Sequence, residues 1–138
     1  MSSLRGVYTR TDARCPSEHQ EQVALMEWWR IWPGKREALL FAVPNGGLRR
    51  IKTAAALRSE GVLAGVPDLF LAALRDGKPG LWIEMKRRHG GRVSEAQRAV
   101  HTQLNAAGYP VIVCHGWEDA RDAIINYLSG DASPSAVL

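Results

Sequence analysis

Residues 65–88 read "GVPDLFLAALRDGKPGLWIEMKRR", and this stretch predicts a β-hairpin. We expect strands at 66–73 and 81–87, joined by a turn at 75–80 (RDGKPG) whose residues favour chain reversal. Two carboxylates, Asp68 and Glu84, stand among the apolar residues of the hairpin, and Lys86 follows closely. An acid at the start of an apolar run adds little to solubility. These three residues are therefore candidates for a chemical role.

Strand geometry places the three charged side chains close together. Side chains alternate between the faces of a strand, so Glu84 and Lys86 share a face about 7 Å apart. Pairing within the hairpin can bring Asp68 beside Glu84, and two adjacent carboxylates repel each other unless a proton or a cation lies between them. Oxygen ligands without cysteine or paired histidine suit Mg²⁺ or Mn²⁺. Lys86 could then activate a water or stabilise charge on a phosphate. The alternative is an ordinary Glu–Lys pair on a solvated face.

The other patterns predict an α/β domain with the element order α-β-α-β-β-α-β-α. Two helix starts carry a capping box, Ser17 with Gln20 and Ser94 with Gln97. The apolar run at 110–115 predicts a strand buried on both faces and parallel to strand 81–87 through a right-handed crossover. The further expected elements are a helix from Ser17 to Pro33-Gly34, a strand at 38–43, a helix at 53–61, a helix from Ser94 to Gly108 and a helix at 118–128.

The chain length of 138 residues suits one domain. We expect a flexible leader at 1–16, a folded domain at 17–128 and a flexible tail at 129–138. No apolar run approaches the roughly 20 residues that span a bilayer, and the first residues lack the apolar segment of a signal peptide. We therefore expect a cytoplasmic protein that does not associate with membranes. The two cysteines, Cys15 and Cys114, favour neither a disulfide nor a zinc site.

Positive charge is concentrated in two segments. The formal net charge is +4, with 18 Lys and Arg against 14 Asp and Glu. The excess lies in residues 47–60 and 84–98, on either side of the hairpin's carboxylates. A clustered basic field suits a polyanion such as nucleic acid. Two solvated faces are the alternative.

Three tryptophans lie within five residues of the first helix. Two stripes at helical spacing are possible for the buried face of this helix. One consists of Gln22, Leu25, Trp29 and Trp32, and the other of Glu21, Leu25, Trp28 and Trp32. Trp28, Trp29 and Trp32 cannot all face one way, so we expect one of them to be exposed at an interface.

Five motifs in order carry a family resemblance. They are "SEHQEQ" (17–22), "PNGG" (44–47), "GVPDLFL" (65–71), "IEMK" (83–86) and "SEAQ" (94–97). Together they resemble the VRR-NUC (virus-type replication-repair nuclease) domain of the PD-(D/E)xK nuclease superfamily, from about residue 17 to 128. A PD…ExK pair alone is a weak signal, whereas five matches in order are a strong one.

The resemblance implies a restriction-endonuclease-like core, a mixed sheet flanked by helices, and a Mg²⁺- or Mn²⁺-dependent endodeoxyribonuclease. It assigns metal binding to Asp68, Glu84, the backbone carbonyl of Met85 and Glu18, and catalysis to Asp68, Glu84, Lys86 and Gln97. The residues themselves also allow other interpretations of these roles. In these, Glu18 only complements the helix dipole, Glu21 rather than Glu18 reaches the metal, and Gln97 only closes its capping box.

The basic segments and the asparagine after the first strand are the expected DNA contacts. They are Asn45, Arg49, Arg50, Lys52, Arg87, Arg88 and Arg92. Asn45 with Gly46-Gly47 either forms a simple turn or lets DNA approach the backbone. The four histidines share no spacing and are treated as incidental, except that His89 lies beside the predicted site.

The resemblance also implies a substrate and an assembly. Stand-alone members of the family resemble junction-resolving enzymes that work as symmetric dimers. We therefore expect a homodimer that cuts branched DNA, such as four-way junctions or flaps, as a phage-like or DNA-repair nuclease would. With no recognition domain evident, we expect DNA shape to be recognised. A non-catalytic DNA-binding module on the same fold is the alternative.

Overall fold

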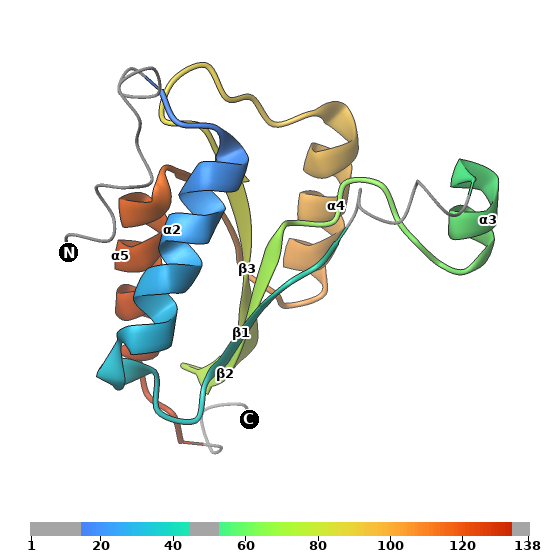
Figure 1. Cartoon of the computed structure of the whole chain (residues 1–138). Helices are drawn as coiled ribbons and strands as arrows, with labels where there is room; N and C mark the ends of the chain where they lie inside the picture. The colour runs from blue at the N-terminus through green and yellow to red at the C-terminus, as the bar shows by residue number, and fades with distance from the viewer. Residues whose placement is uncertain (1–14, 45–52, 134–138) are drawn as a thin grey trace.

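The computed structural model describes residues 15–44 and 53–133 of the chain. Its sheet has four strands in the order β1-β2-β3-β4 (Figure 1). The β1–β2 and β2–β3 pairs are antiparallel, and β3–β4 is parallel, as the crossover predicts. The strands are β1 Leu39–Ala42, β2 Leu69–Arg75, β3 Lys78–Lys86 and β4 Val111–His115. The mixed α/β sheet that the sequence predicts is confirmed.

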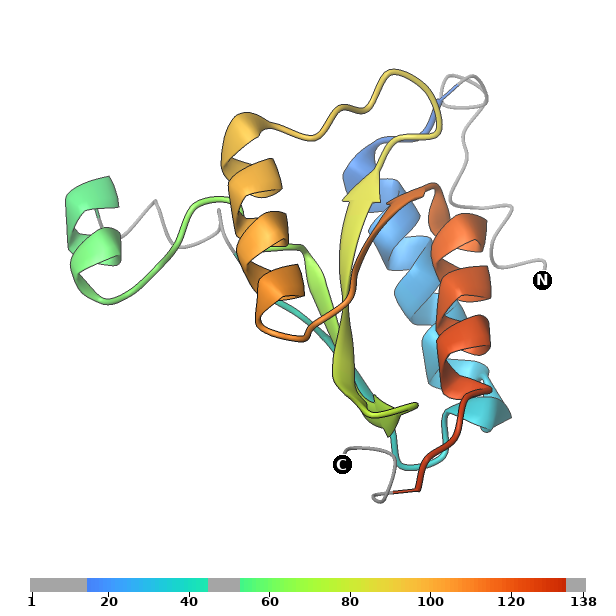
Figure 2. The same ribbon diagram turned by 180° about the vertical axis from the view of Figure 1, so that it is seen from behind.

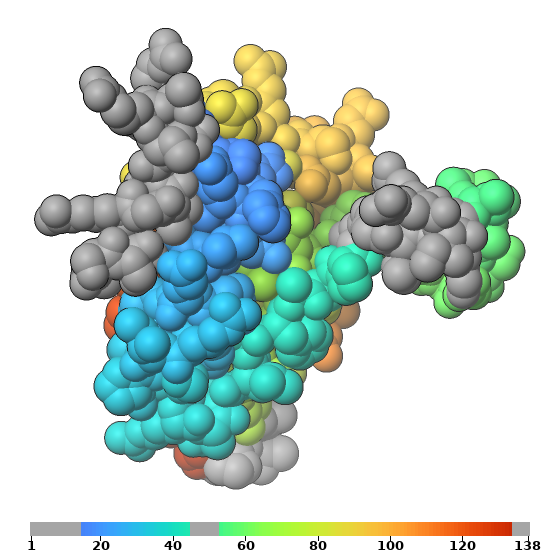
Figure 3. Space-filling view, in the orientation of Figure 1, coloured from blue at the N-terminus to red at the C-terminus, as the bar shows by residue number. Residues whose placement is uncertain are grey.

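Helices cover both faces of this sheet. The longer helices α2 and α5 lie side by side on one face, and α4 lies on the other (Figures 1 and 2). The short helix α3 stands away from the sheet and projects from the body of the protein (Figure 3). The helices are α2 Glu18–Ile31, α3 Ala54–Ser59, α4 Glu95–Ala106 and α5 Trp117–Leu128, with a short 3₁₀ turn at Pro33–Lys35.

Both predicted capping boxes are present. Ser17 Oγ accepts a hydrogen bond from the N–H of Gln20, and the Gln20 side chain accepts one from the N–H of Ser17. Ser94 and Gln97 make the same reciprocal pair at the start of α4. Since each box satisfies two otherwise unpaired N–H groups, the two helix starts follow directly from local sequence.

The hairpin turn is shorter than expected. Only Asp76 and Gly77 form it, both with positive φ (49° and 76°), and Arg75 pairs with Lys78. Aspartate followed by glycine favours this two-residue turn, because both positions need a left-handed backbone. The expected turn at 75–80 was therefore wrong. Pro79 is accommodated within β3 where the ladder shifts register opposite residues 73–74, since a proline lacks an N–H for regular pairing.

Strand β4 is less buried than its composition predicts. Val111, Ile112 and Val113 are half-buried, and Cys114 alone in the strand is buried. The expectation of burial on both faces was wrong because β4 lies at one edge of the sheet, where β3 is its only neighbouring strand among the described residues.

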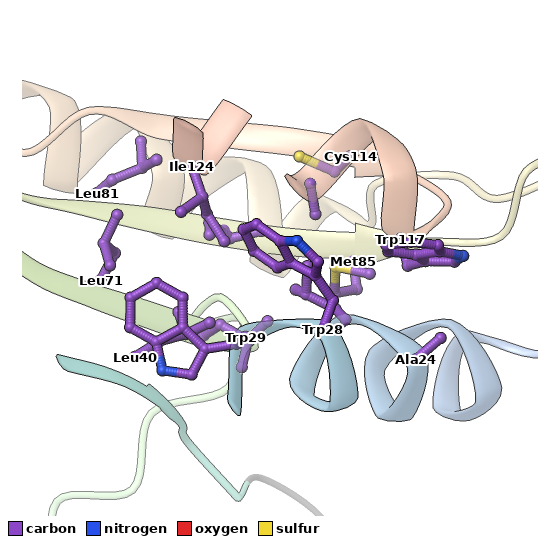
Figure 4. Packing of buried hydrophobic residues seen from close by; sticks show 14 residues of the cluster. Ala24, Trp28, Trp29, Leu40, Leu71, Leu81, Met85, Cys114, Trp117 and Ile124 are labelled. Atoms are coloured by element: carbon purple, nitrogen blue, oxygen red, sulfur yellow. The ribbon is translucent and has the colours of Figure 1, made fainter. Parts of the chain in front are cut away.

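The hydrophobic core lies between the sheet and the pair of helices α2 and α5 (Figure 4). Alternate residues of β3 point into it, as period-two alternation predicts. Each large apolar side chain buried here contributes about 1.5–3 kcal/mol. The fully buried members include Ala24, Leu25, Leu69, Leu71, Ile83, Met85, Cys114, Ala120 and Ile124.

All three tryptophans of α2 belong to this packing. Trp28 and Trp29 are buried, and Trp32 is half-buried and stacks on Trp28 with 4.8 Å between ring centroids. The expectation of one exposed tryptophan was wrong, because the buried face of α2 is wide enough to include both predicted stripes.

The two ends of the chain are described only in part. The expected leader lies outside the described residues except for Cys15 and Pro16, and so do residues 134–138 of the expected tail. The first residues of that tail are attached to the hairpin: the N–H of Asp76 donates to the carbonyl of Asp131, and the N–H of Asp131 donates to Asp76 Oδ1. No helix in the described part of the chain has the length and apolar character needed to cross a membrane.

Candidate active site

Asp68 and Glu84 lie side by side because of the β2–β3 register. Leu69 pairs with Ile83, so Asp68 and Glu84 face each other one step further along the ladder. Asp68 Oδ2 accepts a 2.8 Å hydrogen bond from the N–H of Met85, and the Asp68 carbonyl accepts one from the N–H of Val43 at the end of β1. The carboxylate of Asp68 is thus anchored to the strand that carries Glu84, as the sequence predicts.

Glu84 is buried on the face of the sheet that α4 covers. Only 1% of its side chain is exposed. Gln97 Nε2 donates a 3.0 Å hydrogen bond to Glu84 Oε2, and His101 Nε2 lies 3.1 Å from Glu84 Oε1. Two residues one helical turn apart therefore hold the two oxygens of a single carboxylate.

Lys86 lies on the same face and is also buried, with 5% of the residue exposed. Its ammonium donates a 3.0 Å hydrogen bond to Gln97 Oε1, which also accepts from the N–H of Ser94 at 2.9 Å. Gln97 therefore closes the capping box and joins Lys86 to Glu84 at the same time. The two roles that its position in the sequence left open are compatible.

The surroundings of Glu84 disfavour its charged form. The pKa of the Glu84 carboxyl is raised to about 9, chiefly by burial and then by the hydrogen bond and negative charge of Asp68, while Lys86 acts in the opposite direction. Burial and the nearby charge of Lys86 lower the pKa of His101 below its usual value. Glu84 therefore holds a proton at neutral pH unless a positive charge takes its place.

Two carboxylates in this arrangement fit a hard divalent cation. Carboxylate oxygens suit Mg²⁺ or Mn²⁺, and the like charges of Asp68 and Glu84 would be offset by the ion. Among the described residues, no group of three or more His, Cys, Asp or Glu side chains is arranged to hold a metal. A cation here would take its other ligands from backbone carbonyls and water, as Mg²⁺ often does.

Glu18 and Glu21 of α2 have different surroundings and different roles. Glu18 is exposed at the start of the helix, and its charge contributes to the raised pKa of Glu84. Glu21 is fully buried and accepts hydrogen bonds from Arg88 Nε at 2.7 Å and from the N–H of Trp117 at 3.0 Å. Glu21 is therefore bound within the fold, and Glu18 is the acid of α2 that acts on the site.

The predicted DNA-contacting residues also differ among themselves. Arg87 and Arg92 are exposed. The Arg88 guanidinium is paired with Glu21 and Glu118, so its charge is balanced inside the protein. The other predicted contacts, Asn45, Arg49, Arg50 and Lys52, lie outside the described residues.

Gly65 brings the loop before Asp68 against the first turn of α4. Its φ is +97°, and a Cβ at this position would overlap the carbonyl oxygen of Ala96 and lie 2.9 Å from the N–H nitrogen of Gln97. A residue with a side chain would therefore separate the two segments that carry Asp68 and Gln97.

His101 is the site residue that the sequence reasoning missed. The four histidines show no metal-ligand spacing among themselves, so that pattern does not distinguish His101 from the others. The available signal was the four-residue spacing from Gln97, which puts both side chains on one face of a helix. His89, the histidine expected beside the site, is instead exposed in the turn after β3.

Comparison with known proteins identifies the family of the chain. No curated protein matches the chain. The VRR-NUC domain model matches residues 5–118. A solved structure described as "VRR_NUC domain protein" aligns with a TM-score of 0.67 and 27% identity, over 83% of this chain and 91% of its own. The chain therefore belongs to the VRR-NUC family, and its domain is of the nuclease type.

Proposed function

We propose that this protein is a Mg²⁺- or Mn²⁺-dependent endonuclease that hydrolyses phosphodiester bonds in DNA. The observation that carries the proposal is the pairing of Asp68 with Glu84 at one end of β3, with Lys86 on the same buried face. A buried carboxyl whose pKa is raised, as that of Glu84 is, beside a second carboxylate is typical of a functional site rather than of a solvated sheet face.

The residues divide the chemistry among them. Asp68, Glu84 and the backbone carbonyl of Met85 would hold the cation, with Glu18 acting from α2. A bound divalent cation would lower the pKa of a water and offset charge on the scissile phosphate. Lys86 would stabilise the negative charge that develops on the phosphate, and Gln97 would hold both Lys86 and Glu84 in place.

DNA binding is assigned to the basic residues near this site. Arg87 follows β3 directly, Arg92 lies between β3 and α4, and both are exposed, which suits contacts with phosphates. Asn45, Arg49, Arg50 and Lys52 are proposed as further DNA contacts from their residue types alone. Arg88 is the weakest member of the set, since two carboxylates already balance its charge.

Branched DNA is the proposed substrate, cut by a homodimer. A two-fold pair of domains would present two sites to a four-way junction, which has matching symmetry. The tryptophans of α2 do not support an interface, because none of them is exposed. Exposed Ile125 on α5 remains available to contribute apolar contact.

A panel of flaps, four-way junctions, single strands and linear duplexes tests the proposal, each with Mg²⁺, with Mn²⁺ and with a chelator. Metal-dependent cutting is expected, and it should be abolished in Asp68→Asn and Glu84→Gln with DNA binding retained. Binding without cutting under any condition would favour the non-catalytic module instead.

Two further measurements test the substrate preference and the homodimer. Equal cutting of a four-way junction and its linear control would reject branched-DNA preference. Light scattering that gives the 15.2 kDa mass of one chain, rather than twice that mass, would reject the homodimer.

A further inference from the structure

His101 and Gln97 approach the same buried carboxylate from successive turns of α4. Gln97 Nε2 donates to Glu84 Oε2 at 3.0 Å, and His101 Nε2 lies 3.1 Å from Glu84 Oε1. The His101 side chain is 12% exposed and that of Glu84 is 1% exposed. The contact is therefore screened from water on both sides.

Two donors hold a carboxylate in a way that one donor cannot. The terminal torsion of a glutamate side chain is broad, so a hydrogen bond to one oxygen leaves the other free to swing. Contacts to both oxygens restrict that rotation. Each oxygen has two lone pairs, so one remains on each for a metal ion.

Little else in the structure can replace His101 in this role. The buried Oε1 atom has no ready access to bulk water, so removing the ring leaves it without this hydrogen-bond partner. Lys86 lies on the same face as Glu84, but its ammonium donates to Gln97.

We propose that His101 is a positioning residue of the nuclease site, which donates Nε2–H to ionised Glu84 and orients that carboxylate toward the metal ion. This inference rests on the proposed function. It assigns His101 to the support of a ligand rather than to metal binding itself, because its Nε2 faces Glu84 and an imidazole is a poor partner for Mg²⁺.

The test compares three substitutions at one position in the full-length protein. His101→Gln keeps an N–H donor at a similar reach, His101→Asn keeps a donor that is too short, and His101→Leu removes it. Gln103→Leu, at an exposed position of α4, is the matched control. Titration with MnCl₂ alone by calorimetry gives metal affinity without DNA, and cleavage at saturating Mn²⁺ gives turnover.

His101→Leu and His101→Asn should weaken Mn²⁺ binding by about 10- to 100-fold, the usual cost of losing a hydrogen-bond partner of a metal ligand. His101→Gln should stay close to the wild type, as should Gln103→Leu. Thermal melting checks that each variant folds. If His101→Leu does not fold, the comparison of His101→Gln with His101→Asn still shows whether Mn²⁺ binding depends on a donor that reaches Glu84.

Each remaining outcome overturns a specific claim. Wild-type affinity in both His101→Asn and His101→Leu would show that the hydrogen bond does not position Glu84. Equal loss in His101→Gln and His101→Leu would show that the imidazole itself is needed, as for a direct ligand. In both cases a wild type that still binds Mn²⁺ and cuts DNA leaves the proposed function standing. A wild type that neither binds Mn²⁺ nor cuts would overturn the function and this inference together.

Discussion

The carboxylate of Asp68 accepts a 2.8 Å hydrogen bond from the backbone N–H of Met85, the residue between Glu84 and Lys86. Two motifs that are well separated in the sequence are thus one unit in the structure.

Loss of the Lys86 ammonium should slow cleavage without preventing metal binding. Lys86→Met keeps most of the buried aliphatic chain and removes the charge that Gln97 Oε1 holds. We expect the cleavage rate to fall about 10²–10³-fold, as for loss of one preorganised donor in other enzymes. Single-turnover cleavage at saturating Mg²⁺ measures this. Collapse of metal affinity with unchanged turnover would mean that Lys86 has a different role.

The metal-free protein should lose stability as pH rises. The pKa of Glu84 is raised from 4.5 to about 9 in the fold, chiefly by burial and then by Asp68. Between these values the folded state holds a proton that the unfolded state releases, so this contribution is complete below about pH 4.5 and is lost as pH rises toward 9. The slope from one such group is at most about 1.4 kcal/mol per pH unit.

Melting curves in chelator and in Mg²⁺ test this dependence. The fall in melting temperature should be steeper in chelator, because a bound cation gives ionised Glu84 a partner. Glu84→Gln has no titrating group at this position and should flatten the curve. An identical slope in Glu84→Gln and the wild type would assign the effect to other residues.

Arg88 should matter more for stability than for DNA binding. Its guanidinium pairs with fully buried Glu21 and with Glu118. Arg88→Met should leave Glu21 without its main counter-charge and cost about 3–5 kcal/mol of unfolding free energy. The double variant Arg88→Met with Glu21→Gln should recover part of that loss. Urea unfolding measures both, and a neutral Arg88→Met would contradict the pairing.

Arg87 and Arg92 should instead account for salt-dependent DNA binding. Both are exposed, so their charges are available to phosphates. Each substitution to Gln should lower the slope of log affinity against log salt by roughly 1 and weaken binding to all sequences alike. Arg30→Gln, at the far end of α2, is the control. A slope that stays unchanged in both variants would leave these residues as ordinary surface charges.

Gly65→Ala should displace site residues although Gly65 itself is not one of them. An added Cβ would overlap the carbonyl of Ala96 and force apart the segments that carry Asp68 and Gln97. Gly61 has nearly the same φ, +96°, with nothing within 4 Å of an added Cβ. Gly61→Ala should therefore show only the cost of the left-handed backbone, about 1–2 kcal/mol.

The difference between the two glycine variants isolates the packing effect. Gly65→Ala should lose more stability than Gly61→Ala and should also lose most cleavage activity, whereas Gly61→Ala should cut DNA at the wild-type rate. Equal activities in the two variants would show that close contact with α4 is not needed for the site.

Local sequence determined the features that depend on neighbouring residues. The two capping boxes depend on side chains three positions apart, and the alternation in β3 separates Ile83 and Met85 from Glu84 and Lys86 by strand geometry alone. Asp68 and Glu84 could be recognised as candidate site residues for the same reason, because both stand among the apolar residues of predicted strands. The two-residue turn was also encoded locally, by Asp76-Gly77, but the surrounding turn-forming residues obscured it.

Only the tertiary structure decided which residues share a contact across distant segments. The burial of β4 depends on its place at the edge of the sheet, and the separate roles of Glu18 and Glu21 depend on where α2 meets Arg88 and the start of α5. His101 joined the site because α4 packs over β3 with Glu84 facing it. Periodicity shows which face of an element a residue occupies, but the partner of that face is set by packing between elements far apart in the chain.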